Sequence, residues 1–102
     1  MDIKTNKSIK KFIESVSREF PAKLIILFGS YLTNKQTENS DIDIAVIVDK
    51  YEGDIINANS RLFSLVREID VRIEPLFLER KYDKSGFIEG IIKEGKILYS
   101  SD

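Results

Sequence analysis

Three stretches of the chain place apolar residues at the spacing of an α-helix. The first begins at about Lys7 and ends before Pro21, because proline disfavours helical geometry in the residue that precedes it. The second runs from about Asp54 to Ile69. The third is predicted to stop at Gly95, and its apolar positions are Phe87, Ile88, Ile91 and Ile92.

The remaining apolar segments have the length and composition of β-strands. Leu24–Phe28 is wholly apolar, and Asp41–Val48 begins with alternation before it becomes apolar. Asp70–Leu78 alternates again, and Pro75 within it indicates an edge strand or a bulge. Ile97–Tyr99 is predicted to form a short final strand. This order of elements predicts an α/β fold, with a small mixed sheet and flanking helices.

Composition limits the chain to one domain and a narrow range of chemistry. With 102 residues, of which 42% are apolar, one compact core is expected over residues 1–102. The 16 basic and 17 acidic residues are interspersed, which argues against direct binding to nucleic acid or to a membrane. The sequence has no cysteine and no histidine, so thiolate metal sites and Ser-His-Asp catalysis are excluded.

The N-terminal sequence has no signal-peptide pattern, and no apolar run approaches 18 residues. A soluble, cytoplasmic protein is therefore expected.

Gly29 and Ser30 follow directly after the first predicted strand. Glycine allows the backbone to turn sharply, and Ser30 is suited to cap a short helical turn. The free N–H groups at the start of such a turn attract phosphate. We therefore expect a phosphate-binding turn at the tip of this strand.

Asp41 and Asp43 open the second predicted strand and share one of its faces, because side chains alternate along a strand. Two carboxylates on one face repel each other unless a cation lies between them. Mg²⁺ prefers such oxygen ligands when water and substrate phosphate complete its shell. The pair therefore predicts phosphoryl or nucleotidyl transfer.

Gly29-Ser30, ten further residues and then Asp41-Ile42-Asp43 resemble the signature of the polymerase-β-like nucleotidyltransferases, in their minimal form. The resemblance implies that fold, and a reaction in which a nucleoside monophosphate is transferred from a triphosphate, with ATP as substrate. It also implies that the Gly29-Ser30 turn holds the β- and γ-phosphates, while Asp41 and Asp43 bind two Mg²⁺ ions. Related sequences often carry an arginine after the turn; here Leu32-Thr33-Asn34 stands in that region, and Lys35 is the candidate substitute.

The family usually has a third carboxylate on a later strand, where it completes the metal site and acts as a base. Asp70, Arg72 and Glu74 alternate in the third predicted strand, and we expect them to share one face. Glu74, in the middle of the strand, is the first candidate for the third carboxylate. Asp70 is the alternative, although it also suits a turn between helix and strand. Glu74 could also serve only as an ion-pair partner of Arg72.

A chain of this size leaves no room for a second domain that would bind the acceptor. Stand-alone domains that resemble this one are paired with HEPN-domain toxins, and they add AMP to a tyrosine of the toxic RNase. The resemblance therefore implies an antitoxin that is a protein adenylyltransferase and forms a hetero-oligomer with its toxin. The alternative is an antitoxin of the same fold that neutralises its partner by binding, with weak catalysis or none.

Overall fold

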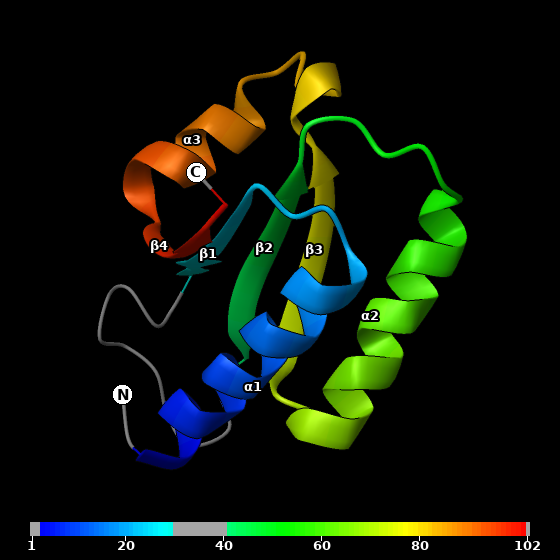
Figure 1. The fold of residues 1–102 in the computed structure, drawn as a ribbon. Helices are drawn as coiled ribbons and strands as arrows, with labels where there is room; N and C mark the ends of the chain where they lie inside the picture. Colours follow the sequence, from blue (N-terminus) through cyan, green and yellow to red (C-terminus); the bar gives the residue numbers. More distant parts are fainter. Residues whose placement is uncertain (1–2, 30–40, 102) are drawn as a thin grey trace.

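The computed structural model describes residues 3–29 and 41–101. In this part of the chain a four-stranded sheet lies between helices on its two faces (Figure 1). The strands are β1 (Leu24–Phe28), β2 (Ile42–Val48), β3 (Ile73–Glu79) and β4 (Lys96–Ser100). The helices are α1 (Ile3–Glu19), α2 (Ile55–Ile69) and α3 (Phe87–Glu94), with a 3-10 turn, η2 (Arg80–Tyr82), after β3.

The sheet has the strand order β3-β2-β1-β4 and is mixed. β1 pairs antiparallel with β2 and with β4, whereas β2 and β3 run parallel. Pro75 lies in β3 at the edge of the sheet, opposite Ile44 of β2. The predictions of an α/β fold, of a mixed sheet and of an edge position for Pro75 are all confirmed.

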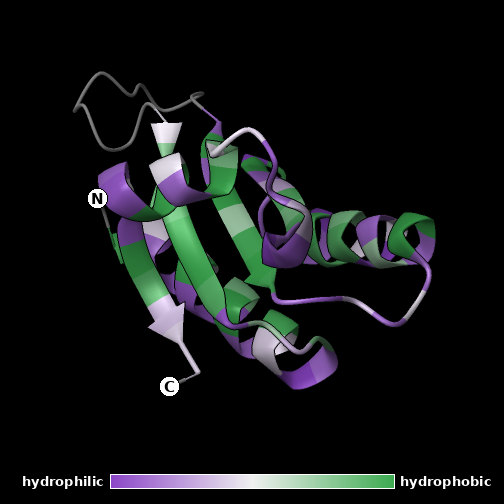
Figure 2. Cartoon of the chain, turned by 90° about the horizontal axis from the view of Figure 1, so that it is seen from above, coloured by the Kyte–Doolittle hydropathy of each residue, from purple (hydrophilic) through white to green (hydrophobic). Residues whose placement is uncertain are grey.

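Two hydrophobic clusters hold the helices against the sheet. The larger cluster lies between α1, α2 and one face of the sheet, and Phe12, Ile44 and Leu62 are fully buried within it. The smaller cluster packs Ile88 and Ile91 of α3 against the opposite face. Figure 2 shows largely apolar strands in the sheet, whereas the helices carry both polar and apolar residues. Within the described residues no helix is long and apolar enough to cross a membrane.

α1 begins at Ile3, four residues before the predicted start at Lys7. The apolar pattern begins later than the helix does, because the first buried position of the helix holds Thr5, a polar residue that is 1% exposed. Its hydroxyl accepts a hydrogen bond of 3.0 Å from the Arg72 guanidinium, which satisfies the buried oxygen.

β3 begins at Ile73, so the prediction that the strand starts at Asp70 was wrong. Asp70 is the C-cap residue of α2, and its carboxylate accepts a hydrogen bond of 3.0 Å from the backbone N–H of Arg72. This bond closes a turn that the sequence alternation could not distinguish from a strand. The expectation that Arg72 and Glu74 share one strand face was also wrong, because Arg72 lies in the turn and reaches α1.

Candidate active site

Strand register brings Asp43, Glu74 and the end of β1 together at one end of the sheet. Asp43 of β2 lies opposite Phe28, the last residue of β1, and opposite Glu74 of β3. Side chains of paired residues project from the same face of a sheet. Ala45 and Ile47, which alternate with Asp43, pack against α3, so Asp43 and Glu74 lie on that face. The backbone N–H of Ile42 donates to the carbonyl of Arg72 over 2.7 Å, which fixes the two carboxylates in this register.

Gly29 follows β1 directly and adopts a φ of +79°, in the left-handed region that favours glycine. A Cβ built on Gly29 would overlap the Oδ2 atom of Asp43. Glycine is therefore required at this position for two reasons: the left-handed turn, and the carboxylate that lies beside it. The expectation of a glycine turn at the end of this strand is confirmed, whereas Ser30 and Lys35 lie outside the described residues.

The Asp43 carboxyl is affected by its burial and by the neighbouring Asp41. Burial raises the pKa of the Asp43 carboxyl, and the negative charge of Asp41 raises it further. Asp41 is exposed and Asp43 is half-buried. The pair therefore concentrates negative charge at the start of β2, as expected for residues that ligate a cation.

The two candidates for a third carboxylate have different surroundings. Asp70 forms an ion pair of 2.8 Å with Arg72, and its side chain is only 8% exposed. The hydrogen bonds from the Arg72 side chain are the main cause that lowers the pKa of Asp70 to about 2. Glu74 is exposed and lies in register with Asp43. Asp70 is thus engaged in the turn, while Glu74 occupies the strand position beside the aspartate pair.

The described carboxylates suit Mg²⁺ in number and chemistry, although they do not enclose it. Among residues 3–29 and 41–101 no three acidic side chains are gathered closely enough to hold a metal ion. Mg²⁺ is usually held by one or two carboxylates together with water and substrate phosphates. Asp41 and Asp43 supply that number, and the missing Cβ of Gly29 leaves room for the Asp43 carboxylate beside the turn.

α3 borders the same end of β1, and the sequence reasoning gave it no part in the site. A cavity of about 590 Å³ lies between α3 and the end of β1, and Phe28 and Gly29 line it. Two glycines four residues apart, Gly86 and Gly90, also line the cavity. Gly86 is the N-cap of α3, whereas Gly90 lies inside the helix. The signal in the sequence was therefore a glycine in a helix interior, where it weakens the helix.

Comparisons with known proteins agree with this geometry. The family described as polymerase beta, nucleotidyltransferase, matches residues 8–102. A protein of Methanocaldococcus jannaschii named "putative protein adenylyltransferase" is 34% identical over 98 residues, which cover 91% of this chain and 96% of that protein.

Two solved structures share the fold. A chain in the crystal structure of a toxin-antitoxin with AMP-PNP has a TM-score of 0.65 and 31% identity, over 95% of this chain and 73% of that chain. A "putative nucleotidyltransferase" from Sulfolobus solfataricus has a TM-score of 0.61 and 18% identity, over 99% of this chain and 90% of that chain, and it supports the fold alone. Because the family model matches nearly the whole chain and the Methanocaldococcus jannaschii relative is 34% identical over 96% of its length, the chain belongs to the polymerase beta nucleotidyltransferase family, as its sequence signature predicted.

Proposed function

We propose that this chain is a Mg²⁺-dependent protein adenylyltransferase that transfers AMP from ATP to a hydroxyl group of a partner protein. The observation that carries the proposal is the contact between Gly29 and Asp43. It supports the proposal because nucleotidyl transfer needs the turn that would bind phosphate to lie close to a carboxylate that would bind metal.

Each site residue has a role in the proposed reaction. Gly29, Ser30 and Lys35 hold the β- and γ-phosphates, and Asp41 and Asp43 are the carboxylates that hold two Mg²⁺ ions. The bound ions would neutralise charge on the triphosphate. Glu74 is the third carboxylate, and its place beside Asp43 in the sheet supports this assignment.

The acceptor hydroxyl oxygen attacks the α-phosphorus and forms a new P–O bond. The bond from the α-phosphorus to the oxygen that bridges to the β-phosphate breaks, and pyrophosphate leaves with the electron pair. Glu74 takes the hydroxyl proton as general base. The acceptor thus gains AMP, and atoms and charge balance.

The proposed partner is a HEPN-domain RNase toxin, with one of its tyrosines as the acceptor, and the chain acts as its antitoxin in the cytoplasm. Two observations support a protein partner: the family resemblance of the signature, and the likeness to a chain of a toxin-antitoxin structure that contains AMP-PNP.

Intact-mass spectrometry of the HEPN protein tests this function, after incubation with the chain, ATP and Mg²⁺. The wild type should add the mass of one AMP to the toxin, and Asp43→Asn should add none. Asp49→Asn is the matched control, because Asp49 is an exposed aspartate just beyond the other end of β2. If Asp43→Asn labels the toxin at the wild-type rate, the assigned chemistry is wrong.

A second function, inhibition by binding alone, is favoured by two observations. The described carboxylates do not form a three-membered metal site, and the base candidate Glu74 is exposed. The variant Asp41→Asn with Asp43→Asn separates the two functions. Under the adenylyltransfer mechanism it fails to neutralise the toxin at catalytic ratios, whereas stoichiometric inhibition that survives both substitutions would select the binding module.

A further inference from the structure

The cavity beside Gly29 has the features of a small-molecule site. Its volume of about 590 Å³ lies within the range of about 300–1,000 Å³ that is typical of ligand pockets. One wall comes from the end of β1 and the other from one face of α3. The lining residues that matter for its chemistry are Phe28, Gly29, Gly86, Phe87, Gly90 and Glu94.

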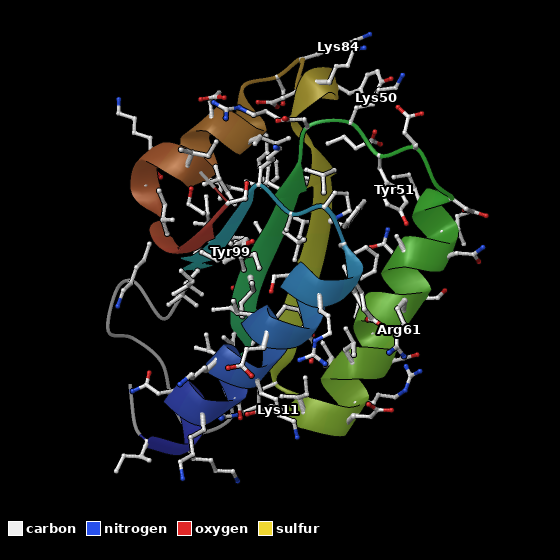
Figure 3. All side chains as sticks on the ribbon, viewed as in Figure 1. Lys11, Lys50, Tyr51, Arg61, Lys84 and Tyr99 are labelled. Atoms are coloured by element: carbon white, nitrogen blue, oxygen red, sulfur yellow. The ribbon has the colours of Figure 1, made fainter. Side chains whose placement is uncertain are left out.

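Two aromatic rings line this cavity. Phe28 is half-buried against the smaller hydrophobic cluster, while Phe87, at the start of α3, is 53% exposed. Neither ring belongs to the cluster of Phe20, Tyr51 and Phe77 that packs near the opposite end of β2. Figure 3 shows Tyr51 near the loop that follows β2, on the side of α2 rather than that of α3. A large aromatic side chain half in solvent at a cavity mouth is suited to stack on a flat ring.

The glycine on α3 keeps this cavity open. A Cβ built on Gly90 meets no atom within 4 Å, so neither packing nor close backbone approach requires glycine there. Glycine in a helix interior lowers the stability of the helix. Packing around Gly90 gives no reason for this loss of stability. Any side chain at Gly90 would instead extend into open space on the cavity side of the helix.

The cavity is also continuous with the proposed phosphate site, because Gly29 belongs to both. On one side Gly29 contacts the carboxylate of Asp43, and on the other it lines the cavity. A ligand with its phosphates at the turn would therefore place its remaining part against Phe28 and α3. Glu94, at the last turn of α3, brings a carboxylate to the lining that can accept a hydrogen bond from an amino group on a ring.

We infer that this cavity binds the nucleobase of the nucleoside triphosphate, between the end of β1 and the glycine-lined face of α3. The inference rests on the proposed function, because it places the base relative to phosphates held at the Gly29 turn. It assigns to α3, an element outside the sequence signature, the recognition of the nucleotide base. Phe28 and Phe87 supply the apolar and stacking contacts, and Gly90 supplies the room.

Isothermal titration of the 102-residue chain with Mg²⁺-ATP and with Mg²⁺-tripolyphosphate tests this site. Gly90→Leu fills the cavity, and Phe87→Ala removes one of its rings. Each should weaken ATP binding at least about tenfold and leave tripolyphosphate binding unchanged, because only ATP carries a base. Ser60→Leu is the control, since it adds the same side chain at an exposed position of α2, on the other layer.

Thermal melting shows whether the variants are folded. Gly90→Leu should melt no lower than the wild type, because it replaces glycine by a good helix former in open space. If wild-type chain binds ATP and both variants bind it equally well, the base site is overturned while the proposed function stands. If both variants bind ATP normally but no longer modify the partner, the cavity serves the acceptor, and the inference is again wrong. If the wild type binds neither ATP nor tripolyphosphate, the proposed function fails as well.

Discussion

The carboxylate of Asp43 occupies the space that Gly29 leaves by lacking a Cβ. The two residues are 14 positions apart, and the antiparallel pairing of Phe28 with Asp43 brings them together. The glycine of the sequence signature thus shapes the carboxylate site as well as the turn. This relationship gives the first prediction.

Gly29→Ala should reduce adenylyl transfer at least about 100-fold, because its methyl group displaces the Asp43 carboxylate from the turn. It should also destabilise the fold by about 1–2 kcal/mol, because alanine is strained at a φ of +79°. Transfer is measured by the mass shift of the partner, and stability by urea unfolding. For stability alone, Gly90→Ala is the matched control and should melt no lower than the wild type, since its added Cβ meets open space. Normal transfer by Gly29→Ala would show that the contact is dispensable.

Asp43→Asn should raise the melting temperature at pH 7. The pKa of Asp43 is raised above its ordinary value of 3.8, so the folded state holds the proton more tightly than the unfolded state. The favourable contribution of Asp43 to the free energy of unfolding is therefore complete below pH 3.8, and it is lost as the pH rises through the folded pKa. The gain from Asp43→Asn should therefore shrink on acidification, which melting curves at several pH values will show. A variant less stable than the wild type at pH 7 would mean that the charge is compensated in the fold.

Glu74→Gln should lower the rate of adenylyl transfer by about 10²–10⁴-fold, as expected when a general base is removed. Its affinity for the nucleotide should change much less, because the proposed phosphate contacts come from the turn and from ions held by the aspartate pair. Single-turnover labelling of the partner measures the rate, and isothermal titration measures the affinity. Glu68→Gln, an exposed position on α2, is the control. Unchanged labelling by Glu74→Gln would exclude Glu74 as the base.

Asp70→Asn should lower the free energy of unfolding by about 1–2 kcal/mol at pH 7, because it breaks a nearly buried ion pair with Arg72. The pKa of Asp70 is lowered to about 2, so its stabilisation is present above the ordinary value of 3.8 and is lost as the pH falls towards 2. Urea unfolding at pH 7 and at pH 2 should thus show a smaller difference at the lower pH. The folded variant should still transfer AMP; if it cannot, Asp70 rather than Glu74 belongs to the site.

Most of the fold was predictable because, in most helices and strands, the buried positions hold apolar residues at the spacing typical of that element. β1 has the predicted bounds, and α2 begins one residue after Asp54, whose carboxylate accepts a hydrogen bond of 2.9 Å from the backbone N–H of Ile56. The errors lie where a polar residue is buried or a turn alternates like a strand. Thr5 and Asp70 illustrate the two cases, and the guanidinium of Arg72 binds both of them.

The candidate site was predictable in part. The spacing of Gly29, Asp41 and Asp43 indicated that they would meet, but only strand register shows that Asp43 lies opposite Glu74. Register depends on contacts between distant segments, and an alternating pattern does not specify its partner strand. The cavity against α3 was not predictable for the same reason. It forms between Gly90 and the end of β1, and the sequence does not show that these two segments face each other.

The main hydrophobic core and the candidate site lie on opposite faces of the sheet. The larger hydrophobic cluster lies with α1 and α2, whereas Asp43, Glu74 and the cavity lie on the face of α3. Mutations that adapt the proposed base site to another nucleotide can therefore accumulate on the cavity-lining side of α3 without eroding the main source of stability. Descendants of one ancestral domain could then diverge in specificity and still melt at similar temperatures.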